Sequence, residues 1–399
     1  MTIDFDYIKI RLMGKWSIFS AKDGKGDEKR KEIRYILSID GGGMRGVVPA
    51  YILSRINKEL KKETDRPLYS FFDLVAGTST GALIALALTS PSQDCLLSYE
   101  DGSEYEIFDE ITYKRLFRVH HEKVLKGSIK RSIDPDSLVS LYRANGYRIF
   151  HQPSHFKKLI GNVFSDKYDS SSIERFFSSA YKETGLDEAL VPTIAVAFDP
   201  LTSKPYVFSS WDSHGFLLKE AARASSAAPT YFSPVSLIDR ETGENLTLVD
   251  GGLCANNPIL LAYSKARELY PNADEFRVLS ISTCSLSSSF DPSSSSGGLA
   301  TWVSSLWKSY ASGTTELADI VADSIKDLKY LRIWDNVVKK KYSMDDYSDE
   351  AMNTLLEAAE ELYKNKEAQI NEFIHDMTLN VNNDSVKLKG PEEHLLIDK

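Results

Sequence analysis

Two successive segments of this chain repeat one pattern, in which a short apolar run meets a glycine-rich turn and a helix-forming stretch follows. The first apolar run, residues 33–39, leads into the glycine-rich residues 40–46. The second run, residues 74–76, leads into residues 77–81, and the strongly apolar residues 82–88 come next. A strand that enters a helix through a glycine turn, twice in succession, is typical of an α/β fold with a parallel sheet.

Later apolar runs predict further strands of this sheet, at residues 193–198, 206–209, 246–249 and 277–281. We therefore expect one large α/β domain over residues 33–376. Residues 1–32 are expected to form an N-terminal extension, and residues 377–399 a polar C-terminal tail.

The composition narrows the classes of function. The 399 residues carry a formal net charge of -9, so we expect no DNA or RNA binding through overall charge. The cysteines are few and widely spaced, which predicts no disulfide framework and a reducing compartment. The longest purely apolar stretch, residues 82–88, is far shorter than the roughly 20 residues of a membrane-spanning helix, and the N-terminus does not resemble a secretory signal. We expect a cytoplasmic protein that reaches any membrane from the water side.

The first glycine turn allows three interpretations. Gly41, Gly43 and Gly46 fit the G-x-G-x-x-G pattern of dinucleotide-binding folds. Asp40 argues against a dinucleotide because its charge would repel a pyrophosphate, and the next strand ends in a second glycine turn instead of the acid that holds a ribose. A tight turn would need only one glycine, whereas three in a row favour an oxyanion hole, in which backbone N–H groups approach a ligand closely.

The second glycine turn, Gly77-x-Ser79-x-Gly81, matches the nucleophile elbow, a sharp strand-to-helix turn that exposes a serine hydroxyl. A serine that merely caps the helix is the alternative. A serine nucleophile needs a base, and none of the seven histidines stands at a predicted strand end beside glycine. Asp250 does, because it follows the predicted strand 246–249 and precedes two glycines, although an acid in an ordinary turn would look the same.

Taken together, residues 40–46, 77–81 and 250–252 resemble the sequence motifs of the patatin-like phospholipases, in the same order. The resemblance extends over about residues 33–373. It implies a three-layer α/β fold with a mainly parallel central sheet flanked by helices. Further segments similar to that family are residues 224–232, 256–258 and 330–333.

The same resemblance implies the chemistry. Ser79 would be the nucleophile and Asp250 the base of a Ser–Asp dyad that uses no histidine, metal or cofactor. Gly42 and Gly43 would supply N–H groups to the oxyanion. The function implied is a phospholipase A-type lipid acyl hydrolase, which cleaves membrane phospholipid esters through an acyl-enzyme. The residues implied for the oxyanion hole and the elbow are Gly41, Gly42, Gly43, Arg45, Gly77 and Gly81.

A basic segment, residues 111–131, carries seven Lys or Arg side chains and one acid in an otherwise acidic chain. Anionic lipid headgroups would suit this charge. A solvated basic helix face is an equally simple interpretation, and a pocket for a phosphorylated regulator is the third. The candidate contacts are Lys114, Arg115, Arg118, Lys123, Lys126, Lys130 and Arg131.

Two alternatives concern the biological role. Some bacterial patatin-like enzymes similar to this chain are antiphage effectors, which a cyclic nucleotide switches on to degrade the cell's own membrane. A cyclic oligonucleotide is therefore an alternative activator here. A storage or scaffold protein with vestigial esterase activity is the alternative of another class, against which the intact glycine loop and dyad residues argue. We expect phospholipid at the membrane surface as the partner, with the protein peripheral to that membrane, and homo-oligomerisation is left open.

Overall fold

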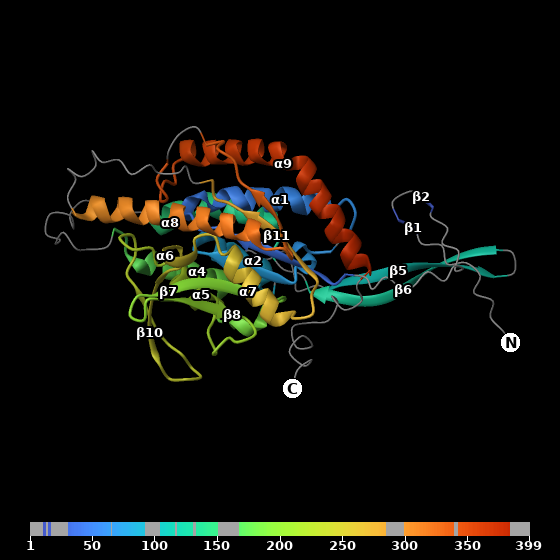
Figure 1. The fold of residues 1–399 in the computed structure, drawn as a ribbon, viewed down its shortest axis with the longest axis horizontal. Coiled ribbons are helices and arrows are strands. Elements are labelled where there is room, and N and C mark those ends of the chain that lie inside the picture. The colour runs from blue at the N-terminus through green and yellow to red at the C-terminus, as the bar shows by residue number, and fades with distance from the viewer. Residues whose placement is uncertain are drawn as a thin grey trace.

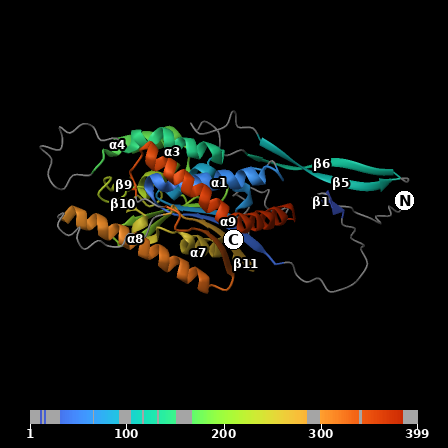
Figure 2. The ribbon, with the colours of Figure 1, turned by 90° about the horizontal axis from the view of Figure 1, so that it is seen from above.

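The computed structural model describes residues 11–12, 15–16, 31–64, 66–91, 104–115, 118–130, 133–150, 167–284, 299–338 and 342–383. An eight-stranded sheet runs through the centre of this part of the chain. Helices cover both faces of the sheet, so the fold has three layers (Figures 1 and 2). This arrangement confirms the predicted α/β fold class.

The sheet places its strands in the order β12–β11–β3–β4–β7–β10–β9, and β8 pairs with β7 beside that path. The strands from β12 to β7 are parallel, whereas β8 and β10 run antiparallel to β7, and β9 runs antiparallel to β10. The strands are β3 (Ile33–Ile39), β4 (Leu74–Thr78), β7 (Thr193–Asp199), β8 (Lys204–Ser209), β9 (Val235–Ile238), β10 (Asn245–Asp250), β11 (Glu275–Ile281) and β12 (Leu328–Ile333).

The register brings the two glycine turns to one edge of the sheet. Ile39, the last residue of β3, is the partner of Gly77 in β4. Because carboxyl ends of parallel strands meet at the same edge, the turns that follow β3 and β4 lie side by side. Every strand predicted from an apolar run is present, within two residues of its expected bounds.

Both faces of the sheet are apolar because helices bury each of them. Along β3, Ile36 belongs to the cluster formed with α7 and α8, whereas Leu37 and Ile39 belong to the cluster formed with α1, α2 and α9. The helices are α1 (Val47–Leu60), α2 (Thr80–Thr89), α3 (Pro135–Phe150), α4 (Ser170–Tyr181), α5 (Leu218–Ser225), α6 (Gly252–Ala255), α7 (Ile259–Leu269), α8 (Leu299–Ser324) and α9 (Asp349–Asn383).

Where the structure describes the basic segment, at residues 111–115 and 118–130, it forms strands and no helix. β5 (Glu104–Arg115) pairs antiparallel with β6 (Arg118–Lys130), and this hairpin extends away from the helical layers (Figure 1). The interpretation as a basic helix face was therefore wrong. Its β-branched and aromatic residues, interleaved with the charges, favour extended backbone. The side chains of the seven basic residues lie outside what the structure describes, so their contacts stay predictions.

The C-terminal helix continues past residue 376, where the sequence suggested a boundary. α9 runs to Asn383, and its Met377 is fully buried. Met377 follows Ile370 and Ile374 at helical spacing on the same buried face. The segment expected to be a polar tail therefore begins inside a packed helix. Of the expected N-terminal extension, the structure describes only residues 31–32 and the short strands β1 (Arg11–Leu12) and β2 (Lys15–Trp16).

A helix that crosses a bilayer has to be both long and apolar. Within the described part of the chain, no helix meets both requirements.

Candidate active site

Ser79 lies in the turn between β4 and α2. Its φ of 54° and ψ of −122° are a conformation that a residue with a side chain keeps only when its surroundings require it. An added Cβ on Gly77 would lie 2.2 Å from the carbonyl carbon of Gly81, and one on Gly81 would lie 2.2 Å from the carbonyl oxygen of Ile39. Close backbone packing thus requires both elbow glycines. The Ser79 side chain makes no capping hydrogen bond to α2, so the helix-cap interpretation was wrong.

The hydroxyl of Ser79 instead donates a hydrogen bond to Asp250, with 2.7 Å between Oγ and Oδ2. Asp250 is the last residue of β10. Its other carboxylate oxygen, Oδ1, accepts the N–H of Gly252 at 2.7 Å, and its own N–H donates to the carbonyl of Ala227 at 3.0 Å. Each carboxylate oxygen therefore has a donor, and the group is held in one orientation toward the serine.

Burial raises the pKa of Asp250 from 3.8 to about 6, although the hydrogen bonds from Ser79 and the Gly252 N–H act in the opposite direction. The residue is only 2% exposed, and removal of water disfavours a charged carboxylate. A carboxylate with this pKa is still ionised at neutral pH, and it is a stronger base than an exposed one. The arrangement can therefore accept a proton from a serine hydroxyl.

Ser225 supports the elbow from α5. Its Oγ accepts the N–H of Ser79 at 2.9 Å and donates to the carbonyl of Val196 in β7 at 2.5 Å. Ser225 is fully buried. The strained backbone of Ser79 is thus tied to the central sheet through one hydroxyl.

The glycine loop, residues 40–46, offers two candidate oxyanion donors. The N–H of Gly41 donates to the carbonyl of Asn256 at 3.0 Å, so this group is occupied. No acceptor among the described residues takes up the N–H of Gly42 or of Gly43. These two N–H groups can therefore serve a developing negative oxygen, whereas Gly41 has a supporting position.

Packing within the chain explains the run of glycines. An added Cβ on Gly42 would lie 2.3 Å from Oγ1 of Thr283. At Gly43 the φ of +60° disfavours a side chain, and an added Cβ would lie 2.3 Å from the carbonyl oxygen of Met344. The protein itself, without any ligand, requires glycine at both positions. Consecutive glycines at these positions therefore do not by themselves indicate the close approach of a ligand.

Ion pairing holds the start of the glycine loop. Asp40 is buried and forms a two-pronged ion pair with Arg332 of β12, with distances of 2.9 Å and 2.6 Å. Its charge is therefore compensated, which weakens the argument that Asp40 would repel a pyrophosphate. Arg45 donates from Nε to the carbonyl of Gly42 at 3.2 Å, and burial lowers its pKa to about 10. Arg45 thus stabilises the conformation of the glycine loop through a hydrogen bond inside the loop.

A pocket of about 680 Å³, its open mouth included, adjoins Ser79. Helices α3 and α4 supply much of its wall, and the side chains that line it are mostly aliphatic and aromatic. Its apolar lining suits a hydrocarbon chain. Apolar lining residues include Leu83, Leu141, Ile149, Phe150, Ile173, Phe176 and Met344.

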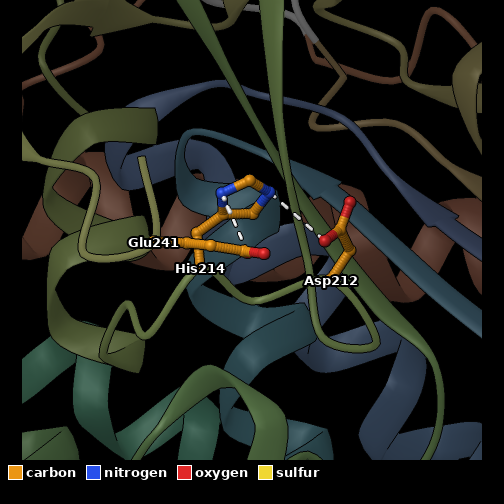
Figure 3. A group of neighbouring side chains, drawn as sticks. All are labelled: Asp212, His214 and Glu241. Atoms are coloured by element: carbon orange, nitrogen blue, oxygen red, sulfur yellow. Dashed lines mark ion pairs between the residues drawn. The ribbon is translucent and has the colours of Figure 1, made fainter. Parts of the chain in front are cut away.

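A separate group of side chains could offer ligands to a metal ion. Asp212, His214 and Glu241 present one ligand atom each within 4.8 Å of one another (Figure 3). His214 lies between carboxylates, with Nε2 3.2 Å from Asp212 and Nδ1 2.8 Å from Asp239. Asp212 and Glu241 are exposed, and none of the four residues lines the pocket. Ion pairing accounts for this geometry, which by itself gives no reason to place an ion there.

Three residues around Ser79 were not predicted from the sequence: Ser225, Arg332 and Met344. The first two stand in segments 224–232 and 330–333, which already resembled the family, so a comparison of those segments could have pointed to them. Met344 belongs to no such segment. Its position over Gly43 follows only from the tertiary structure.

Comparison with known proteins agrees with the resemblance. Patatin-like protein 2 of Arabidopsis thaliana is 27% identical over 378 residues, which cover 84% of each chain. Patatin-17 of Solanum cardiophyllum is 26% identical over 382 residues, 87% of this chain and 88% of its own. The "Probable inactive patatin-3-Kuras 1" of Solanum tuberosum is 24% identical over 381 residues, 87% of this chain and 91% of its own.

Among solved structures, VipD from Legionella pneumophila aligns with 92% of this chain and 71% of its own at a TM-score of 0.30 and 10% identity, which is too weak to support an argument. The family model described as patatin-like phospholipase matches residues 37–263, more than half of the chain. The chain therefore belongs to the patatin-like phospholipases, a family of lipid acyl hydrolases.

Proposed function

We propose that this protein hydrolyses the acyl ester bonds of membrane phospholipids, with Ser79 as the nucleophile and Asp250 as its base. The observation that carries the proposal is the 2.7 Å hydrogen bond from the Ser79 hydroxyl to Asp250 beside an apolar pocket. The protein would act at the surface of the membrane, with the acyl chain drawn into the pocket.

The geometry supports the following reaction. Ser79 Oγ attacks the ester carbonyl while its proton passes to Asp250, and the N–H groups of Gly42 and Gly43 stabilise the oxyanion. Asp250 returns the proton to the departing lysolipid oxygen, which leaves an acyl ester on Ser79. Asp250 then takes a proton from water as that water attacks the acyl-enzyme, and it returns this proton to Ser79 Oγ as the fatty acid leaves.

Family membership alone does not make the protein an active enzyme, because one relative is described as probably inactive. The features that favour activity are local to this chain. Asp250 has a raised pKa, and the elbow holds the Ser79 hydroxyl against it.

The test is fatty-acid release from mixed phospholipid vesicles by the wild type, Ser79→Ala and Asp250→Asn. Ser179→Ala, at an exposed position of α4, is the matched control. We expect release by the wild type and the control, none above background from Ser79→Ala, and a loss of at least about 1,000-fold in Asp250→Asn. Equal release by the wild type and Ser79→Ala would refute the proposal and favour a storage or scaffold role.

Control by a cyclic oligonucleotide stays a prediction, because the basic side chains that would bind it are not among those described. The vesicle assay tests it when a panel of cyclic di- and trinucleotides is added. Release that requires one of them would support a gated effector, and release without any additive would indicate constitutive activity.

A further inference from the structure

A short segment after β12 lies directly on the glycine loop. This segment, residues 342–346, is named the strap. The carbonyl of Met344 accepts the N–H of Met44 at 2.7 Å, and an added Cβ on Gly43 would lie 2.3 Å from the same carbonyl oxygen. The Met344 residue also lines the pocket beside Ser79. The strap thus contacts both the loop with the candidate oxyanion donors and the pocket.

Asp345 anchors the strap at the pocket wall. This residue is 6% exposed, and its carboxylate accepts hydrogen bonds from Lys167, Tyr168 and Ser343. The N–H of Tyr168 donates to the carbonyl of Tyr231, a pocket-lining residue, at 3.0 Å. The anchor is therefore continuous with the pocket wall at Tyr231.

The anchor persists over the ordinary pH range. Burial alone would raise the pKa of Asp345, but the hydrogen bonds from Lys167, Ser343 and Tyr168, with the Lys167 charge, lower it below its usual value. A charged carboxylate beside an ammonium group makes stronger hydrogen bonds than a neutral pair.

The strap bears on catalysis because it fixes the backbone on one side of the oxyanion donors. The N–H of Met44 is held by the strap, and the N–H of Gly41 is held by Asn256. Gly42 and Gly43 lie between these two fixed residues, so the directions of their N–H groups are constrained from both ends. Donors that need no reorientation during the reaction stabilise a transition state most strongly.

We propose that Asp345 is a positioning residue, which holds the strap against the glycine loop and so aims the N–H groups of Gly42 and Gly43 at the oxyanion. The proposal rests on the proposed hydrolase function. The strap lies beyond residues 37–263, so the family match does not include it.

The test compares Asp345→Asn with Asp349→Asn, a matched control at an exposed position at the start of α9, outside the strap. Kinetics are measured with a soluble ester, well below the unfolding temperature of each variant. Misplaced donors cost transition-state stabilisation but not ground-state binding, so we expect kcat of Asp345→Asn to fall roughly 10- to 100-fold. We expect its KM to stay within about twofold, and the control to match the wild type.

A merely structural role would lower the unfolding temperature and leave kcat of the folded enzyme unchanged, and that result would overturn the proposal. So would a raised KM at unchanged kcat. If Asp345→Asn does not fold, the Tyr168→Phe variant tests the proposal instead. This substitution removes one hydrogen-bond donor to Asp345 without a change in charge. A lower kcat at unchanged KM is expected for it, and an unchanged kcat contradicts the positioning role. A wild type no more active than Ser79→Ala would refute the hydrolase function itself.

Discussion

As the proposed base, Asp250 has to meet two requirements that oppose each other. A general base must be ionised at the working pH, yet an ordinary carboxylate is too weak a base for a serine hydroxyl. Burial at the end of β10 raises the pKa of Asp250 to about 6, while the hydrogen bonds from Ser79 and Gly252 keep the charged form accessible. This balance is the physical reason why the pair would function without histidine.

The first prediction concerns pH. Because Asp250 must be unprotonated to accept the Ser79 proton, kcat/KM should be level above its pKa of about 6 and should fall about tenfold for each unit below it. The measurement is a pH profile with an uncharged soluble ester. A profile that stays level down to pH 4 would show that Asp250 is not the base.

The second prediction separates stability from activity. The folded state disfavours the charged form of Asp250, so its pKa is raised on folding. The contribution of Asp250 to the free energy of unfolding is therefore fully present below about pH 4 and is lost as pH rises through about 6. Asp250→Asn removes the buried charge and should gain roughly 1–3 kcal/mol of unfolding free energy at pH 8, while activity disappears. Urea unfolding at pH 8 and pH 4 measures this. A variant less stable than the wild type at pH 8 would contradict it.

At the residue scale, the sequence was sufficient where the signal is local. Ser79 and Asp250 each stand at a predicted strand end beside glycine, so their neighbours along the chain identify them. Ser225 could not be found that way, because it contacts Ser79 from 146 residues away. The raised pKa of Asp250 could not be predicted from the sequence either, because it depends on burial by segments that are distant in the chain.

At the scale of elements, α5 couples the two halves of the candidate site. Its last residue, Ser225, holds the N–H of Ser79, and Ala227 just beyond it accepts the N–H of Asp250. One short helix therefore sets the position of both Ser79 and Asp250 relative to β7.

The third prediction concerns this coupling. Ser225→Ala leaves the Ser79 N–H buried without its acceptor, which should cost about 1–3 kcal/mol of unfolding free energy. We also expect kcat to fall, because the strained elbow can relax. Urea unfolding and ester kinetics measure both effects against Ser179→Ala. If Ser225→Ala matches that control, the elbow does not depend on Ser225.

Elements could be predicted where one periodicity dominates. The buried strands are continuous apolar runs, so their bounds were found within two residues. The segment of β5 and β6 mixes charged and β-branched residues, which fit either a helix or a strand until the partner strand is known. The end of α9 was missed because Met377, Leu379 and Val381 alternate with polar residues instead of following helical spacing, and only the packing of Met377 reveals the helix.

At the scale of the whole molecule, residues after the family match complete the fold. β11 lies between β3 and β12, and α9 packs on α1, so the strand that leads into the glycine loop is interior to the sheet. The ion pair between Arg332 and Asp40 joins this C-terminal part to the loop. No sequence pattern indicates that pairing, which spans 292 residues.

The fourth prediction tests that connection. Arg332→Ala leaves Asp40 as a buried charge without its partner, which should cost about 3–5 kcal/mol of unfolding free energy. Lys329→Ala, in the same strand, removes an exposed ammonium group from Glu275, which keeps its ion pair with Arg277, and should cost less than about 1 kcal/mol. Adding Asp40→Asn to Arg332→Ala should recover part of the loss. Equal stability of the two single variants would mean that the Asp40 pair does not hold the loop.

The most direct measurement of the central claim is covalent trapping with a long-chain alkyl fluorophosphonate, followed by peptide mass spectrometry. An activated serine displaces fluoride and keeps the phosphonyl group, so the modified residue is the nucleophile. The account predicts modification of Ser79 alone, a rate that falls below pH 6, and strong slowing in Asp250→Asn. Modification of a different residue, or equal labelling of Ser79→Ala, would contradict it.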